Sequence, residues 1–246
     1  VMTVFDKWSK DTQQREACSY STQFGHKHST WEAGFRQGGG VSIAALARVG
    51  RQNWRGEFTS KNYLEGAHKA YLHLKENNTH YLDDNTPNII DDYCALLASC
   101  ELYQAELVDM EEVSSWTLSI LSKQGLNPDY PGSFVFREED DKPFFHAVEA
   151  GLPYIALMEA DKILSETCLS DDIQEALAKA FEFELCITAE TFNPFGYSRQ
   201  YIQGQGEKAR SAFFYPHKNP SGYWWQGENA RLASLASAVW IYLSDY

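Results

Sequence analysis

A carboxyl group close to aromatic rings is the most reactive combination in this sequence. Glu228 follows Trp224 and Trp225 and precedes a stretch with apolar residues at helical spacing. An apolar neighbour raises the pKa of a carboxyl group toward the value that a general acid needs near neutral pH. An acidic residue in the first turn of a helix is also favoured by the helix dipole alone. Glu228 is therefore either a general acid or an ordinary helix-start residue.

The segment from residue 193 to 229 combines loop-forming residues with aromatic and titratable side chains. Glycine and proline residues interrupt regular structure there. Aromatic residues such as Tyr197 offer flat apolar faces on which sugar rings stack, although each ring alone could simply close the core over a long loop. His217 lies within this segment, and His146 follows Phe144 and Phe145. A lone histidine is more often structural, so both are candidates only because of where they lie.

Four acidic residues lie at or just before expected helix starts: Glu32, Asp91, Asp92 and Glu149. Together they could hold an ammonium group by charge-assisted hydrogen bonds. The alternative is that they cap helices and pair with Arg36 or Lys142. Three consecutive glycines at 38–40 are not followed by a nucleotide-binding motif, so we expect close helix packing there.

The elements that must position these residues are helices. Apolar spacing predicts helices near 40–49, 60–76, 88–106, 108–124, 143–165, 171–190 and 226–244, and strand-like alternation is nearly absent. The clearest apolar stripe comprises Leu232, Leu235, Ala236, Val239, Trp240 and Leu243. Thr86 and Pro87 suit the start of one helix, and Asp171 with Gln174 forms a capping-box pair at the start of another. The fold class is all-α.

Successive helices group into αα-hairpins: 60–76 with 88–106, 108–124 with 143–165, and 171–190 with 226–244. The helix at 40–49 ends an earlier, incomplete pair. The unusual residues lie in 31–40, 88–93, 143–151 and 222–228, at the starts of every second helix. In a toroid of hairpins these helices run the same way, so we expect their starts to meet at one rim.

Charge and composition exclude several partners. A net charge of −13 repels nucleic acid and anionic membranes, so a neutral or cationic ligand fits better. Five scattered cysteines match neither a disulfide framework nor a zinc site, which is typical of a cytoplasmic protein. No apolar run approaches the roughly 18 residues of a membrane helix. We expect neither a metal nor a cofactor.

The motifs NPFGYSRQ, YPH and WWQGENARLASLASA, in this order, resemble the C-terminal signature region of glycoside hydrolase family nine. The segments WEAGFRQGGGVSIAALAR, NIIDDYCALLASCELY and KPFFHAVEAGLPYIAL are similar to its exo-β-D-glucosaminidase branch, which acts on glucosamine oligosaccharides. The resemblance implies that Glu228 is the proton donor and His217 binds sugar. The full set of substrate-binding candidates is His217, Trp225, Trp224, Tyr197, Arg199, His146, Asp91, Asp92, Glu32 and Glu149.

Two departures from the family pattern shape the expectation. Pro216, His217 and Lys218 stand where cellulases have His-His-Arg, which disfavours cellulose. The catalytic base of the family lies in an Asp-x-Gly-Asp motif, and this chain contains no Gly-Asp dipeptide. The resemblance also implies an (α/α)6 toroid of six hairpins, whereas little more than three are predicted here. Residues 1–246 are thus expected to be the C-terminal portion of one catalytic domain, completed by its upstream half.

The implied reaction is hydrolysis of O-glycosidic bonds with inversion, in which the two catalytic carboxyl groups lie roughly 6.5–9.5 Å apart. The expected substrates are β-1,4-linked glucosamine (chitosan) oligosaccharides, cleaved from one end. One alternative is a cellulase-like β-1,4-glucanase. Alternatives from other classes are an amino-sugar epimerase that uses His146 and His217, and a sugar-binding chain without catalysis.

Overall fold

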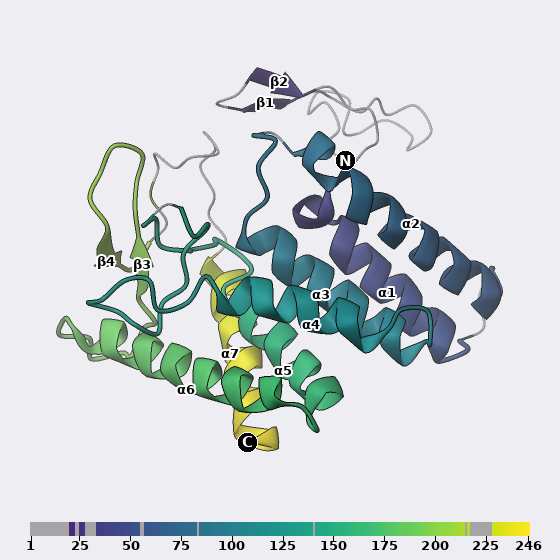
Figure 1. Cartoon of the computed structure of the whole chain (residues 1–246). Helices are drawn as coiled ribbons and strands as arrows, with labels where there is room; N and C mark the ends of the chain where they lie inside the picture. Colours follow the sequence, from purple (N-terminus) through teal and green to yellow (C-terminus); the bar gives the residue numbers. More distant parts are fainter. Residues whose placement is uncertain are drawn as a thin grey trace.

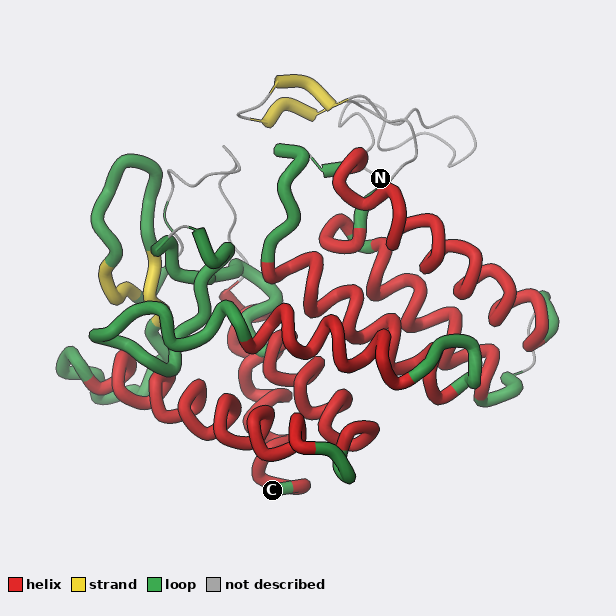
Figure 2. Tube along the Cα trace, in the orientation of Figure 1, coloured by secondary structure: helices red, strands yellow, loops and turns green. Residues whose placement is uncertain are grey.

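The computed structural model describes residues 20–22, 25–27, 33–54, 57–82, 84–139, 141–214, 216 and 228–246. Helices dominate these ranges (Figures 1 and 2): α1 Gly39–Arg51, α2 Ser60–Tyr81, α3 Ile89–Gln104, α4 Met110–Leu121, α5 Leu152–Leu164, α6 Cys168–Ala189 and α7 Glu228–Asp245, with the short 3-10 helix η3 Phe35–Gln37 before α1. The predicted all-α class is confirmed. None of the helices in the described ranges combines the length and apolar character needed to cross a membrane.

Short strands form two antiparallel hairpins. Strands β1 (Tyr20–Thr22) and β2 (Gly25–Lys27) pair near the amino terminus, and β3 (Gln200–Ile202) and β4 (Arg210–Ala212) pair between α6 and α7. Tyr201 lies opposite Ser211 in the second hairpin. This hairpin carries part of the segment in which the sequence concentrates its loop-forming and aromatic residues.

Alternate helices pack side by side. Helix α1 packs on α3, α3 on α5, and α5 on α7, so that these four helices form one layer. The intervening helices lie outside it: α2 packs mainly on α1, α4 on α3 and α5, and α6 on α5. This arrangement agrees with the succession of αα-hairpins that the spacing predicts.

Helix α3 is the centre of the core. Twelve of its sixteen residues are buried, because α1, α4 and α5 all pack against it. A helix buried on all sides is apolar around its whole circumference, which explains its lack of a clear polar face. Gly40 lets α1 approach closely, since a Cβ there would lie 2.5 Å from the carbonyl oxygen of Cys94. The expected close packing at the glycine run is therefore observed.

Two predicted helix starts are displaced. Helix α3 begins after Asn88 rather than at Pro87, because the Asn88 side chain caps the helix and Asp91 completes the capping box. Helix α6 begins at Cys168, so the capping-box assignment to Asp171 and Gln174 is wrong. The Gln174 side-chain amide instead donates hydrogen bonds to Asp161 of α5 and to Ser170 of α6.

A third start, that of α5, lies nine residues beyond the predicted position 143. Residues 143–145 are extended because they pair with residues 134–136 through a bridge between Val135 and Pro143 and a Phe144 N–H bond to the Phe134 carbonyl oxygen, 2.7 Å. The backbone near Phe144 thus pairs with residues 134–136 instead of forming the first turn of a helix. His146 consequently precedes the helix instead of starting it.

The apolar stripe of α7 is only partly buried in this structure. Helix α7 packs on α5, and its buried residues are Arg231, Leu235 and Ala238. In contrast, Trp240 and Leu243 are each 74% exposed. Helix α7 is the last of the layered helices in the chain, and among the described helices α5 is the main one packed against it.

Candidate active site

Glu228 is the first residue of α7, as predicted for a first-turn acid. Three donors converge on its Oε2 atom: the Tyr197 hydroxyl at 3.3 Å, Arg231 Nε at 3.1 Å and Arg231 Nη2 at 3.0 Å. The Glu228 side chain is 19% exposed, whereas that of Arg231 is 1% exposed. The Glu228 carboxylate is therefore held in place through Oε2, while the side chain remains partly exposed to solvent.

The loop after α6 is built to present Tyr197. The Asn193 side chain forms two hydrogen bonds with the backbone of Tyr197, donating to its carbonyl oxygen (2.7 Å) and accepting from its N–H (3.1 Å). Gly196 adopts a φ of 60°, a left-handed conformation that glycine tolerates best. The next residue, Ser198, accepts a hydrogen bond from Arg231 Nη2 at 2.9 Å through its carbonyl oxygen. The loop and α7 are thus joined at the carboxylate.

Arg199 lies on the other side of this loop and faces the β3–β4 hairpin. Its guanidinium lies over the Phe213 ring at 4.6 Å from the centroid, and its Nη2 donates to Ser211 Oγ at 2.5 Å. Tyr197 packs edge-on against the same Phe213 ring. Arg199 is buried, and its Nε has no hydrogen-bond partner among the described residues. In this structure Arg199 supports the hairpin behind Tyr197.

His146 and Glu149 form a second group, at the start of α5. The backbone N–H groups of Val148 and Glu149 donate to His146 Nδ1, at 3.2 and 2.9 Å. Nδ1 therefore carries no proton, and the neutral ring holds its proton on Nε2. Burial lowers the pKa of His146, which favours this neutral form at pH 7. Tyr93 donates its hydroxyl to Glu149 Oε2 at 2.6 Å.

Asp91 and Asp92 make their contacts inside the protein. Asp91 accepts hydrogen bonds from Asn78 Nδ2 and the Asn88 N–H, each at 3.0 Å, and pairs with Arg36 at 3.4 Å. These are the capping and Arg36-pairing roles that stood as the alternative to ligand binding. Asp92 pairs with Lys123 Nζ at 2.9 Å. Burial raises the pKa of both aspartates.

Contacts between successive helix starts connect the two groups. Arg36, just before α1, pairs with Asp91 in the first turn of α3. Tyr93 in that same turn bonds Glu149, just before α5. Gly151 at the start of α5 donates its N–H to Ser234 Oγ of α7, 2.9 Å, and a Cβ at Gly151 would lie 2.1 Å from the Ser234 carbonyl oxygen. The starts of α1, α3 and α5 therefore follow one another in space, and the start of α5 lies against α7 at Ser234, six residues after Glu228.

Sequence reasoning overlooked two charged residues of this region. Arg231 follows Glu228 by three residues, which places it on the same helix face. Glu184 of α6 accepts a hydrogen bond from the Tyr154 hydroxyl at 2.9 Å, and burial raises its pKa to about 7 against the opposing attraction of Arg231. The spacing from Glu228 to Arg231 was a usable signal, whereas nothing local marks Glu184.

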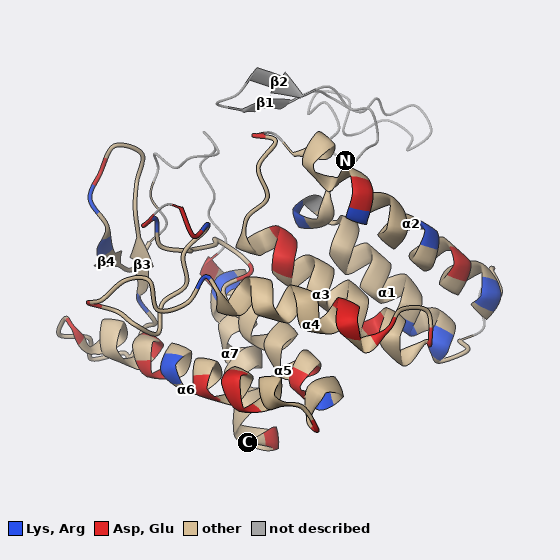
Figure 3. Ribbon diagram, in the orientation of Figure 1, with Lys and Arg blue, Asp and Glu red and all other residues tan. Residues whose placement is uncertain are grey.

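The remaining candidates are Glu32, His217, Trp224 and Trp225, which lie outside the described residues. Within the described ranges, no group of three or more histidine, cysteine, aspartate or glutamate side chains is arranged to hold a metal ion. Acidic and basic residues are mixed along α2, whereas α6 carries mostly acidic residues (Figure 3), as is common on solvated helices. The described candidate residues lie near the starts of α3, α5 and α7 and in the loop after α6.

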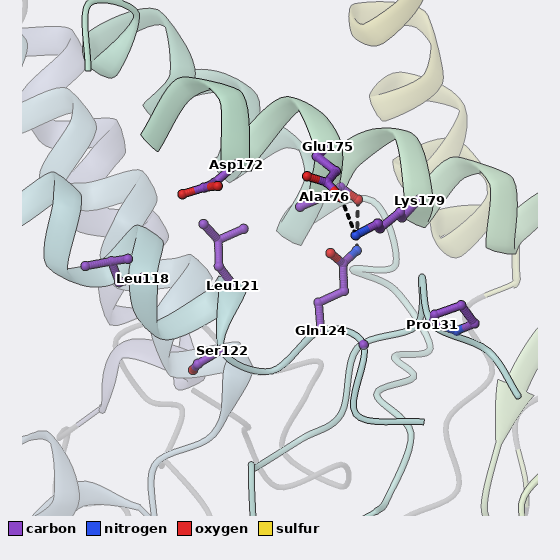
Figure 4. Close-up of a pocket in the computed structure, with 10 residues that line it drawn as sticks. Leu118, Leu121, Ser122, Gln124, Pro131, Asp172, Glu175, Ala176 and Lys179 are labelled. Carbon is purple, nitrogen blue, oxygen red and sulfur yellow. Dashed lines mark hydrogen bonds and ion pairs between the residues drawn. The ribbon is translucent and has the colours of Figure 1, made fainter. Parts of the chain in front are cut away.

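A separate surface cleft of about 420 Å³ lies between α4, the following loop and α6 (Figure 4). Several of its polar side chains already have partners within the protein. Lys179 pairs with Glu175 at 2.6 Å, and the Gln124 amide donates to the Ala176 carbonyl oxygen at 2.8 Å. Leu118 and Leu121 supply apolar lining. None of the sequence-predicted site residues lines this cleft.

Comparison of the chain with models of known protein families gives no match, and comparison with curated proteins gives none either.

Proposed function

We propose that this chain supplies the general acid of an inverting glycoside hydrolase, with Glu228 in that role. The observation that carries the proposal is the asymmetric support of the Glu228 carboxylate: three donors lie on Oε2, and the side chain remains partly open to solvent. A fixed and accessible carboxyl oxygen is what protonation of a leaving group requires. The family resemblance of the surrounding motifs supports the same role.

In the proposed reaction, the Glu228 proton passes to the glycosidic oxygen as the bond from that oxygen to the anomeric carbon breaks. A water molecule adds to the anomeric carbon from the opposite face and gives a proton to a carboxylate base, which inverts the configuration. We propose that the base is an aspartate of an Asp-x-Gly-Asp motif in the upstream half of the domain. No metal or other cofactor takes part in this scheme.

We further propose that the substrate is a β-1,4-linked glucosamine oligosaccharide, with Glu149 as the residue that recognises the amine. Glu149 is partly exposed, and within the described ranges no lysine or arginine pairs with it. Its neighbour His146 is kept neutral by burial and does not balance its charge. Asp91 and Asp92 already have cationic partners. Glu149 is thus the described rim acid best suited to bind an ammonium group.

The proposed fold is the C-terminal part of an (α/α)6 toroid. Its support is the layer of alternate helices α1, α3, α5 and α7, together with the exposed stripe on α7. Trp240 and Leu243 project from the helix that ends the layer in the chain, and a further hairpin from the upstream half would cover them. Exposed apolar patches of this kind commonly mark contact surfaces.

The decisive experiment is Glu228→Gln in the full-length protein, assayed on the β-1,4-linked glucosamine dimer. We expect hydrolysis to fall by about 10²–10⁴-fold, the contribution typical of general acid catalysis. The matched control is Glu111→Gln, because Glu111 is also a first-turn glutamate, at the exposed start of α4. Equal activity in the wild type and the Glu228→Gln variant would reject the proposal.

Substrate choice separates the remaining possibilities. Glucosamine dimer, N-acetylglucosamine dimer and cellobiose are compared side by side, with Glu149→Gln as the variant. Because losing the partner of a carboxylate is costly, we expect the wild type to prefer the amine by about 100-fold in kcat/KM, and the variant to lose most of this preference. Faster cleavage of cellobiose would indicate a β-glucanase. Binding without hydrolysis would indicate a sugar-binding chain, and isomerised sugar an epimerase.

A further inference from the structure

We propose that Arg231 is a positioning residue which, together with Tyr197, holds Oε2 of Glu228 and reserves Oε1 for proton transfer. The inference rests on the proposed function of Glu228 and adds how its proton-donating oxygen is selected. Neither residue needs to touch the substrate in this role. Both act through the orientation of the Glu228 carboxyl group.

The geometry of the Arg231 contact is the first argument. Paired arginine and carboxylate groups often meet in a fork, with two N–H groups bonding the two oxygens separately. Here Nε and Nη2 both contact Oε2, at 3.1 and 3.0 Å, and the Tyr197 hydroxyl approaches the same atom. Among the described residues, all three donors to this carboxylate converge on one oxygen. The other oxygen, Oε1, has no donor among the described residues, and we propose that it faces the leaving group.

The burial of Arg231 is the second argument. Its side chain is 1% exposed, and a buried charge is tolerated only where paired groups compensate for the lost hydration. The compensation comes from Glu228 and from the Ser198 carbonyl oxygen, 2.9 Å from Nη2. Because Ser198 follows Tyr197 directly, Arg231 ties α7 to the same loop that carries the third donor. An arginine needed only for solubility would lie at the surface.

The third argument concerns charge balance. A guanidinium group favours the ionised form of a neighbouring carboxylate, whereas a general acid must carry a proton. Arg231 attracts two carboxylates, Glu228 on its own helix and Glu184 on α6, and the Tyr154 hydroxyl of α5 donates to Glu184. The single positive charge of Arg231 therefore faces two carboxylates, and burial raises the pKa of one of them, Glu184, to about 7. The charge of Arg231 is thus shared between Glu228 and Glu184 rather than devoted to Glu228 alone.

The test uses two substrates that differ in their need for protonation. A β-linked glucosamine dimer has a poor leaving group, whereas a 2,4-dinitrophenyl β-glucosaminide has a leaving group that departs without a proton. For Arg231→Lys in the full-length protein, we expect kcat on the dimer to fall about 10–100-fold, within the range of general acid catalysis, with little change in KM. On the dinitrophenyl substrate we expect a change within about twofold. Tyr197→Phe should show the same pattern at about fivefold, as one neutral hydrogen bond is lost.

Arg48→Lys is the control, since Arg48 also pairs with a buried glutamate, Glu101, at the opposite end of the layer. It should leave both rates unchanged. Equal losses on the two substrates in Arg231→Lys would mean a purely structural role and would overturn the inference, as would unchanged rates in both site variants. If the Arg231→Lys variant does not fold, Tyr197→Phe becomes the test. An unchanged rate of this variant on the dimer would then overturn the inference. Failure of Glu228→Gln to slow the dimer selectively would instead reject the proposed function.

Discussion

Helices α3 and α7 both begin with acidic residues, yet these acids have different surroundings. Asp91 is 1% exposed and its two oxygens receive hydrogen bonds from Asn78 and the Asn88 N–H. Glu228 is 19% exposed, and its described donors all lie on one oxygen. Both oxygens of Asp91 thus have donors, whereas among the described residues only one oxygen of Glu228 does, which is the basis of the catalytic role that we propose for Glu228.

The same contrast extends to the helices themselves. Helix α3 is enclosed by α1, α4 and α5, whereas in the described part of the chain α7 packs mainly on α5. Polar groups in α3 must find partners inside the protein, because burying an unpaired charge is costly. The start of α7 is under less constraint. Its polar residues can be arranged for a ligand rather than only for stability.

The largest expected effect on stability comes from Asp91. Asp91→Ala removes the capping-box carboxylate, leaves the buried Asn78 amide nitrogen without its acceptor and leaves Arg36 with Asp84 as its remaining acidic partner among the described residues. Breaking such a buried pair costs about 3–5 kcal/mol of unfolding free energy. Urea denaturation followed by circular dichroism measures the loss, with the exposed Asp172→Ala as control. A loss below about 1 kcal/mol would mean that Asp91 is not the structural acid in this comparison.

Glu184 of α6 gives a second prediction about stability, in which the unfolding free energy depends on pH. Burial raises the pKa of Glu184 from 4.5 to about 7, so the folded state binds its proton more tightly than the unfolded state. The stability that this proton contributes is complete below pH 4.5 and is lost as pH rises through 7. Glu184→Gln should therefore unfold like the wild type at pH 4 and be more stable at pH 8, by up to about 3 kcal/mol.

The exposed Glu182→Gln, on the same helix, is the control for Glu184 and should match the wild type at both pH values. Thermal and urea unfolding at pH 4 and pH 8 provide the measurement. A difference between Glu184→Gln and the wild type that is the same at both pH values would contradict the assignment, since it would arise from packing rather than from titration.

Sequence patterns were sufficient for the helices but not for their exact starts or facing. Apolar spacing located all seven α-helices of the described ranges, because burial on one face imposes that spacing. It placed the start of α5 at residue 143, where Phe144 in fact pairs with Phe134. Such a pairing is tertiary and leaves no periodic trace. The exposure of the α7 stripe was not predictable for a similar reason, since the stripe is apolar whether or not a partner covers it.

The candidate site was predictable only where local sequence carried the signal. The position of Glu228 at a helix start was predicted from the apolar stripe that follows it, and the structure confirms it. Arg231 was passed over because a charged residue is ordinarily read as exposed, although it lies on the buried face of α7. Glu184 depends on contacts with Tyr154 and Arg231 from two other helices. No pattern within α6 could reveal them.

The smallest effect is expected for Trp240→Ser in the 246-residue chain alone. The Trp240 side chain is 74% exposed, so its removal should change the unfolding free energy by less than about 0.5 kcal/mol. In the full-length protein, where we propose that an upstream hairpin covers this stripe, the same change should cost about 3–5 kcal/mol, as for a buried tryptophan. Leu235→Ala is the matched control, because Leu235 of the same stripe is already buried in this structure and its truncation should destabilise both forms alike. Equal, small effects of Trp240→Ser in the two forms would show that the stripe stays in solvent, and would remove the support that α7 gives to a closed toroid.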